Sequence, residues 1–533
     1  MNTKYLTGIT LVATLGGFLF GFDTAVVNGA ERSLVELFIV KALDSDNYLY
    51  ARELITQYKV LVAIVFIIIY CIISGQLFRL LGLKRGILLF VGLLIPLSVF
   101  LIHYLSNSVP SQENISEIRD ITDSIKGFVV SSALVGCIIG AALSGFIARS
   151  FGRKNGLILT AALLSVSAFG AWQPEILNFF GTLDVYSFMI YRIIGGIGIG
   201  LASILSPMYI AEIAPAGIRG KLVSWNQFAI ISGMVIIYFV NYLIAKSGNE
   251  QWLVSEGWRW MFFSGVIPSV MFFILLLFIP ETPRYLMMKN RKQEALETIV
   301  KISGVENACE IQSEIQETLR EKNVPWLSFG YRVILIGIIL SVFQQFVGIN
   351  VVMYYAANIF RNMGASTDAS LLQTIIVGII NMLFTIVAIF TVDKFGRKPL
   401  MITGALIMAI SMLSLGFSFY AGRTGIVALI FMLFYIAGFA MSWGPVTWVI
   451  LSEIFPNSIR GAMSIPVATL WISNLIISWT FPMLNDNSWL IEKFNHGFSY
   501  WIYGIMCLLA MIFVWKFIPE TKGRSLEEIE KFW

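Results

Sequence analysis

Long apolar runs separated by short polar connectors extend from one end of the chain to the other. A helix needs about 20 residues to cross roughly 30 Å of hydrocarbon. Fourteen segments approach or exceed that length, which predicts an all-α membrane protein with fourteen spanning helices. The segments are 6–28, 57–78, 86–105, 127–148, 155–172, 187–208, 222–244, 260–279, 331–357, 372–392, 399–420, 425–450, 461–483 and 499–518.

Two of these segments, 57–78 and 86–105, have no counterpart in the second half of the chain. Their connector, Phe78-Arg79-Leu80-Leu81-Gly82-Leu83-Lys84-Arg85-Gly86, is short and basic, as expected for a cytoplasmic turn. The stretches on either side of the pair are comparatively acidic. We interpret 57–105 as an inserted hairpin that crosses the membrane and returns. A re-entrant or surface hairpin is the alternative.

The positions of Lys and Arg predict the orientation of the helices, because cytoplasmic connectors of membrane proteins are rich in both. Connectors on the opposite side, 173–186 and 484–492, contain neither. Both chain ends are therefore expected in the cytoplasm. The basic connector residues are Arg79, Lys84, Arg85, Arg149, Arg153, Lys154, Arg219, Lys221, Lys394, Arg397, Lys398, Lys522 and Arg524.

Composition excludes several classes of function. Hydrophobic residues make up 57% of the chain and charged residues 13%, whereas soluble domains carry about 25% charge. The net charge of +5 comes from span ends and connectors, so no nucleic-acid partner is expected. His103 and His496 are isolated, and the four cysteines lack metal-ligand spacing. Without a phosphate loop or a nucleophile–base pair, we expect neither a cofactor nor an enzymatic activity.

Several short motifs occur twice, in the same order and about half a chain apart. Such a repeat in an apolar chain indicates a duplicated helix bundle, and duplicated bundles usually build transporters with the site between the halves. The expected units are a first bundle at 1–280, a cytoplasmic helical linker at 281–328, a second bundle at 329–520 and a cytoplasmic tail at 521–533. The repeated motifs are Phe151–Lys154 and Phe395–Lys398, Glu212 with Ile218–Gly220 and Glu453 with Ile459–Gly461, and Pro280–Thr282 and Pro519–Thr521.

Asp23 and Arg192 are the most conspicuous charges within apolar segments. Charges at membrane depth are costly and are functional candidates by default. A carboxylate there needs a partner or takes up a proton. Asp23 would thus alternate between a salt bridge with Arg192 and a protonated, released state. The alternative is a static structural pair.

Four amides within the spans form a second candidate group: Gln227, Gln344, Gln345 and Asn350. Amides donate and accept hydrogen bonds together, as sugar hydroxyls do. An uncharged amide group therefore favours a neutral polyhydroxyl ligand, with interhelical polar bonding as the alternative. Trp443 and Trp471 would add aromatic faces to such a pocket, although either alone is also typical of a membrane helix. Gly444-Pro445 predicts a broken helix beside Trp443.

The Arg and Glu residues of the repeated motifs predict a cytoplasmic latch. Arg153 and Arg397 would pair with Glu453 and Glu212, either across or within the halves. The positive charge of cytoplasmic connectors alone explains the Arg residues but leaves the Glu residues unexplained. The predicted latch residues are Arg153, Glu212, Arg219, Arg397, Glu453 and Arg460.

These motifs together resemble those of the sugar porters of the major facilitator superfamily, and especially its bacterial D-xylose–proton symporters. The matching stretches include Leu19–Val26, Tyr191–Glu212, Gln344–Tyr355 and Ser442–Pro456. The resemblance implies two pseudo-symmetric six-helix bundles, here with an extra two-helix hairpin, that work by alternating access. It also implies a multi-pass protein of a bacterial inner membrane that functions as a monomer with a monosaccharide and protons.

The resemblance also assigns roles to residues. Asp23 with Arg192 would couple protons, since facilitative relatives carry a neutral residue at that position. At three pocket positions this chain departs from the xylose-symporter pattern, with Met234, Met353 and Leu470 in place of Gln, Leu and Gln. A substrate other than D-xylose, such as glucose or another pentose, therefore stays open, as do an uncoupled uniporter and a sugar sensor. The sugar contacts would come from Phe20, Gln227, Gln344, Gln345, Asn350, Tyr354, Trp443 and Trp471.

Overall fold

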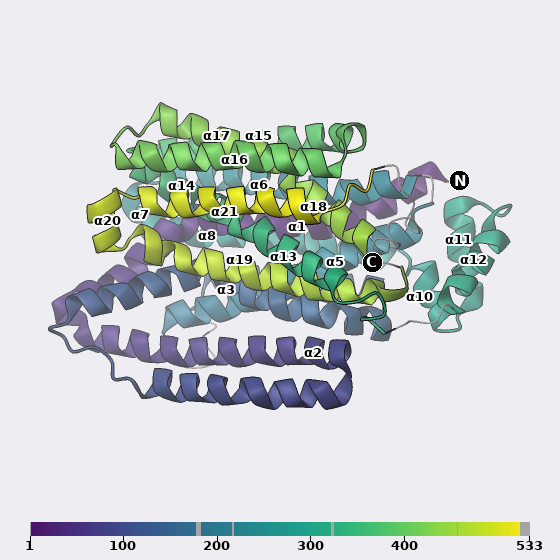
Figure 1. Cartoon of the computed structure of the whole chain (residues 1–533), viewed down its shortest axis with the longest axis horizontal. Helices are drawn as coiled ribbons and strands as arrows, with labels where there is room; N and C mark the ends of the chain where they lie inside the picture. The colour runs from purple at the N-terminus through teal and green to yellow at the C-terminus, as the bar shows by residue number, and fades with distance from the viewer. Residues whose placement is uncertain are drawn as a thin grey trace.

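A computed structural model describes residues 2–176, 178, 183–215, 218–320, 325–455 and 457–522. Fourteen helices in these ranges are long and apolar enough to span a membrane, which confirms the predicted number. They run roughly parallel to the long axis of the molecule (Figure 1). The short helices α10 (Pro283–Met288), α11 (Lys292–Ser303) and α12 (Ala308–Arg320) lie at one end of the bundle, which we call the linker end. The opposite end is the far end.

The first half contains the helices before α10. It begins with α1 (Thr3–Leu34), which continues through a π-turn and a 3₁₀ turn to Leu43. Within this half α3 packs against α5, and α1 against α6. The other helices are α2 (Tyr48–Ser106), α3 (Ile115–Ser150), α4 (Arg153–Trp172), α5 (Asp184–Ile213), α6 (Arg219–Lys246), α7 (Glu250–Trp252), α8 (Trp258–Phe263) and α9 (Val266–Phe278).

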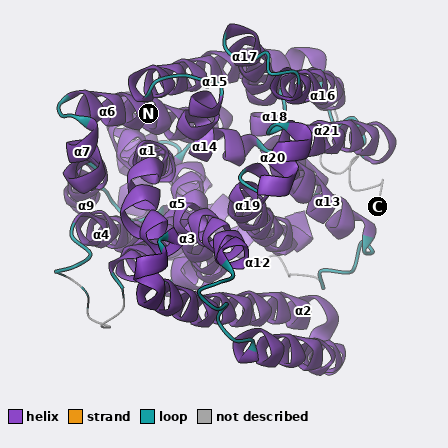
Figure 2. Cartoon of the chain, turned by 90° about the vertical axis from the view of Figure 1, so that its left-hand side faces the viewer, coloured by secondary structure: helices purple, strands orange, loops and turns teal. Residues whose placement is uncertain are grey.

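The second half repeats this arrangement, with α15 packed against α17 and α13 against α19. The two halves meet where α3 lies against α19, α6 against α15 and α1 against α14 (Figure 2). The helices are α13 (Arg332–Phe346), α14 (Ile349–Asn362), α15 (Thr367–Phe395), α16 (Arg397–Tyr420), α17 (Ile426–Met441), α18 (Trp443–Ile454), α19 (Ser464–Asn485), α20 (Ser488–Phe494) and α21 (Gly497–Phe517).

Two spans of the second half are broken. The predicted continuous segment 331–357 is instead divided into α13 and α14 at Gly348, whose φ of +94° favours glycine. A β-carbon on Gly348 would also lie 2.8 Å from the ring of Tyr503. The second break, at Ser442, separates α17 from α18 one residue before Trp443. This confirms the helix break predicted from Gly444-Pro445.

The inserted hairpin forms the two arms of α2, which reverse direction at Gly82 (φ 76°, ψ 171°). Its arms, Tyr48–Gly82 and Lys84–Ser106, both have spanning length and composition. The second arm exposes apolar side chains such as Leu88, Ile95 and Ile102, as expected of a helix that faces lipid. The hairpin lies along the outside of α3 (Figure 1).

Residues at the start of the hairpin fix it to both halves. Tyr58 hydrogen-bonds through its hydroxyl to Ser124 Oγ of α3 at 2.6 Å. Trp479 of α19 donates its indole N–H to Tyr58 Oη at 2.9 Å and to the carbonyl oxygen of Ser124 at 3.1 Å. Near the linker end, Ser464 of α19 donates to Gln76 Oε1 of the hairpin at 3.4 Å. The hairpin thus contacts both sides of the boundary between α3 and α19.

Candidate functional site

Asp23 and Arg192 form an ion pair in the interior of the first half. Arg192 Nη1 lies 2.7 Å from Asp23 Oδ1, and Nη2 donates to the Asp23 carbonyl oxygen at 3.0 Å. The side chains are 1% and 12% exposed for Arg192 and Asp23, respectively. Phe262 covers one face of the guanidinium, with 5.3 Å from Cζ to the ring centroid. Asp23 Oδ2 and Arg192 Nε are buried and have no hydrogen-bond partner among the described residues.

Glycines in the neighbouring turns allow the helices to meet closely around this pair. A β-carbon on Gly21 would lie 1.8 Å from the carbonyl oxygen of Ile230 on α6. One on Gly196 would lie 1.8 Å from the carbonyl oxygen of Ala133 on α3. Small residues of this kind let membrane helices approach through their backbones. Asp23 and Arg192 are therefore held between closely packed helices.

Three of the four predicted amides form a hydrogen-bonded chain. Gln345 donates through Nε2 to Gln344 Oε1 and accepts from Asn350 Nδ2 at 2.6 Å. Both glutamines are at least nine-tenths buried. The break at Gly348 places Asn350 in the first turn of α14, back toward the end of α13. Because each amide both donates and accepts, these three side chains can exchange their hydrogen bonds with one another for hydrogen bonds to a polar ligand.

Two aromatic residues of the predicted site meet across the boundary between the halves. The rings of Phe20 on α1 and Trp471 on α19 have centroids 5.6 Å apart. The indole N–H of Trp471 is buried and lacks a hydrogen-bond partner in the described part of the chain. Tyr354 accepts a hydrogen bond from Asn474 Nδ2 at 3.3 Å. Phe20, Trp471 and Tyr354 therefore belong to helices that come from both halves.

Other predicted site residues lie apart from these contacts. Trp443 is fully buried, and its indole N–H donates to the Met401 carbonyl oxygen at 3.0 Å. Gln227 is half-buried on α6 and makes no hydrogen bond to the amide chain among the described residues. The three departure positions lie on α6, α14 and α19: Met234 is half-buried, whereas Met353 and Leu470 are buried.

The linker-end ion pairs lie within each half. Arg153 pairs with Glu212 at 2.7 Å, and Arg397 pairs with Glu453 at 2.9 Å. Of the two arrangements open at the sequence level, the structure therefore has the one within the halves. Arg219 is exposed at the start of α6, and the side chain of Arg460 lies outside the described residues.

The Pro-Glu-Thr motifs make the same contacts in both halves. Thr282 Oγ1 donates to Glu212 Oε2 at 2.7 Å, and Thr521 Oγ1 donates to Glu453 Oε2 at 2.5 Å. Glu281 accepts from the backbone N–H groups of Arg153 and Lys154 at the start of α4, and Glu520 does so at the start of α16. Both glutamates thus cap helix N-termini. Burial raises the pKa of Glu281, which the N–H donors oppose.

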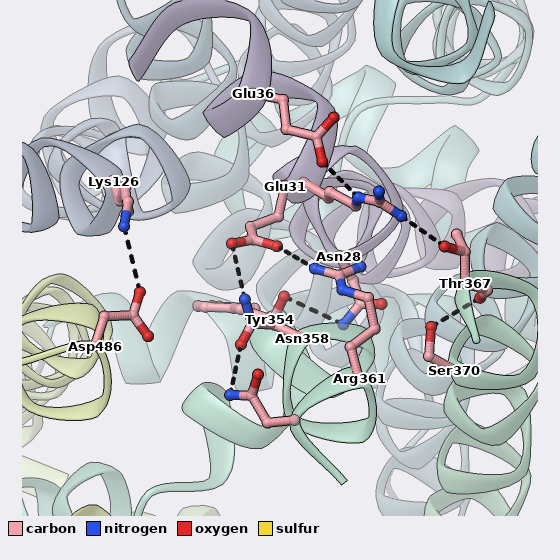
Figure 3. Close-up of polar contacts among 12 residues, drawn as sticks. Asn28, Glu31, Glu36, Lys126, Tyr354, Asn358, Arg361, Thr367, Ser370 and Asp486 are labelled. Atoms are coloured by element: carbon pink, nitrogen blue, oxygen red, sulfur yellow. Dashed lines mark hydrogen bonds and ion pairs between the residues drawn. The ribbon is translucent and has the colours of Figure 1, made fainter. Parts of the chain in front are cut away.

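Contacts at the far end join the two halves. Glu31 of α1 accepts from Arg361 at 3.0 Å and from Asn358 at 3.2 Å, both on α14 (Figure 3). Lys126 of α3 lies 3.5 Å from Asp486, beyond the end of α19. Arg32 donates to Thr367 Oγ1 at 2.7 Å. Among the described residues, the ion pairs between the halves all lie at this end.

The sequence alone missed two buried asparagines in this region. Asn28 donates to the carbonyl oxygens of Met353 and Tyr354, both at 3.1 Å. Asn474 lies three residues after Trp471, on the same helical face. That spacing and the position of Asn28, just over one turn after Asp23, are the signals that point to them.

Comparison with known proteins identifies the family. The family profile described as "Sugar (and other) transporter" matches residues 9–110 and 98–533. The chain belongs to this family of sugar transporters, and it is accordingly a secondary transporter rather than an enzyme.

Individual relatives are similar over much or all of the chain. The D-xylose-proton symporter of Escherichia coli K12 is 49% identical, covering 100% of this chain and 96% of its own. The arabinose-proton symporter of Bacillus subtilis is 38% identical over 79% of this chain and 89% of its own. A structure of the E. coli xylose transporter XylE in a partially occluded inward-open conformation has a TM-score of 0.77 at 46% identity, covering 98% and 100%. The fold is therefore the major facilitator fold.

Proposed function

We propose that the protein is a proton-coupled monosaccharide symporter of the cytoplasmic membrane, with both chain ends inside, that works as a monomer by alternating access. The observation that carries this proposal is the buried Asp23–Arg192 pair. A buried pair adds little net stability, whereas a carboxylate that loses such a partner takes up a proton. Proton uptake at Asp23 would free Arg192 and link protonation to helix movement.

The sugar would bind between the halves. Gln344, Gln345 and Asn350 offer donors and acceptors from the second half, and Phe20 and Trp471 offer aromatic surface where the halves meet. The unpartnered N–H of Trp471 suits a hydroxyl acceptor. D-xylose is the first substrate to test, because the 49% identical relative is a D-xylose-proton symporter. Glucose is the second substrate to test, because Met234 and Leu470 replace two amides of the xylose-symporter pattern and leave the choice of sugar open.

The test is sugar-induced proton uptake by the purified protein in liposomes, across a panel of pentoses and hexoses. We expect uptake of protons with D-xylose or a related sugar. Asp23→Asn should reduce uphill sugar uptake at least tenfold while sugar exchange continues, because exchange needs no net protonation. Uphill uptake that survives in Asp23→Asn would contradict the coupling role.

A second candidate is an uncoupled uniporter, since the glucose facilitated diffusion protein of Zymomonas mobilis is 41% identical over 77% of this chain. Sugar flux without any proton uptake would support it. Sugar binding without flux would instead indicate a sensor.

A further inference from the structure

The carboxylate of Asp23 has one oxygen engaged and one free. Oδ1 accepts from Arg192, whereas Oδ2 is buried and has no partner among the described residues. Oδ2 is therefore the oxygen that is free to take up a proton while Arg192 stays bound to Oδ1. A protonated carboxyl becomes a donor, and a buried donor without an acceptor is costly.

Ser167 of α4 and this free oxygen both border the space beside Gly195, and no hydrogen bond joins them in this conformation. Its side chain is fully buried, and its hydroxyl has no partner in the described part of the chain. The point where a β-carbon on Gly195 would lie is 2.3 Å from Ser167 Oγ and 3.9 Å from Asp23 Oδ2. Gly195 thus leaves space beside both oxygens, and any larger residue there would displace the hydroxyl.

We infer that Ser167 is a positioning residue for proton coupling, whose hydroxyl accepts the proton of Asp23 Oδ2 directly or through one bridging water. No covalent bond changes except that the proton joins Oδ2, and Ser167 keeps its own proton. This inference rests on the proposed function. It adds a residue that stabilises the protonated state of Asp23 after Arg192 is released.

Other groups around Asp23 also bear on its protonation. Arg192 of α5, Cys137 of α3 and Tyr354 of α14 interact with it electrostatically. From α6, the uncharged Ile230 and Gly233 pack against the turns of α1 just before Asp23, at Gly21 and at Phe18 and Phe22. From α8, Phe262 covers Arg192. The variants below leave all of these groups unchanged.

The experiment compares wild type with Ser167→Ala and Ser167→Cys in liposomes. Loss of a hydrogen bond to the protonated form lowers proton affinity, so half-maximal sugar-driven proton uptake should shift to lower pH by about 0.4 to 1 unit. Sugar affinity and sugar exchange should stay within about twofold. The cysteine variant keeps the side-chain size with a weaker acceptor, so it should shift in the same direction.

The matched control is Ser206→Ala. Ser206 is also fully buried, and its hydroxyl lacks a hydrogen-bond partner among the described residues. Its Oγ lies 2.1 Å from the point where a β-carbon on Gly16 would be. Gly16 lies two turns before Asp23, roughly 10 Å along α1. Ser206→Ala should therefore leave the pH profile unchanged.

A second measurement separates this inference from the proposed function. Infrared difference spectra of the purified protein report the carboxyl band that Asp23→Asn removes, and its midpoint pH should fall in Ser167→Ala. If wild type moves no protons yet this midpoint shifts, symport is wrong, whereas the hydrogen bond between Ser167 and protonated Asp23 stands. Wild-type proton uptake with an unchanged Ser167→Ala profile and midpoint overturns the inference. An equal shift in Ser206→Ala, or a loss of sugar affinity with Ser167→Ala, overturns it as well.

Discussion

The linker-end ion pairs Arg153–Glu212 and Arg397–Glu453 connect helices of the same half, whereas two far-end ion pairs, Glu31–Arg361 and Lys126–Asp486, connect one half to the other. Arg153–Glu212 and Arg397–Glu453 hold α4 to α5 and α16 to α18. Glu31–Arg361 instead holds α1 to α14. Similar chemistry therefore serves rigidity within each half at one end and contact between the halves at the other.

This difference teaches which end is closed. The far end has the bonds that must break for the halves to separate there, and the linker-end pairs can persist while the halves move as rigid bodies.

The largest effect is expected from Arg361→Ala. Glu31 is 7% exposed, so removing Arg361 leaves a buried charge with only Asn358 as a partner from α14. A hydrogen bond to a charged group contributes about 1.5–3 kcal/mol. Because the bond between Arg361 and Glu31 forms only when the far end is closed, its loss destabilises that conformation alone. The population should shift about 10- to 100-fold toward separation at the far end.

Spin labels at both ends measure this shift. Labels at Asp120 and Lys493 report the far end, and labels at Asn155 and Lys394 report the linker end. All four residues are exposed, and the exposed Cys71 and Cys309 are replaced beforehand. The far-end distance should lengthen while the linker-end distance shortens. Arg423→Ala, an exposed arginine just beyond α16, is the control. An unchanged distance distribution in Arg361→Ala would refute the role of the pair.

A smaller shift in the same direction is expected from Trp479→Phe. Phenylalanine keeps the ring packed against Phe128 but loses the N–H that binds Tyr58 and Ser124. The loss of about 0.5–1.5 kcal/mol corresponds to a several-fold change in population. The same label pairs measure it. Trp501→Phe is the matched control, because the buried N–H of Trp501 has no partner among the described residues. Equal shifts in both variants would mean that ring packing, not the bond to the hairpin, is responsible.

The sequence predicted the fold well because lipid imposes a simple rule. Each spanning helix must be long and apolar, so the number of spans and the hairpin could be counted from the pattern. The two helix breaks differed in how clearly the sequence indicated them. Gly444-Pro445 indicated the break beside Trp443, whereas Gly348 is a single glycine whose positive φ and close approach to the distant residue Tyr503 are visible only in the folded chain.

The site was only partly predictable for a related reason. Asp23 and Arg192 could be paired because charges at depth need partners. In contrast, Ser167 and Asn474 are residues that occur often in membrane helices, and only the packing shows what they face. Whether Arg153 pairs with Glu212 or with Glu453 likewise depends on the conformation, which the spacing of the repeated motifs leaves undetermined.

The smallest change in conformation is expected from Glu212→Gln and Glu453→Gln. Each removes the charge that binds an arginine within one half, and the two halves make the same bonds. Each variant should therefore lower the free energy of unfolding of the purified protein by a similar amount, about 1–3 kcal/mol. Without sugar, both label distances should stay as in wild type, because these pairs do not cross between the halves in this conformation. Glu310→Gln, at an exposed glutamate of α12, controls for loss of charge. A far-end distance that changes in either latch variant would show that the linker-end pairs act between the halves after all.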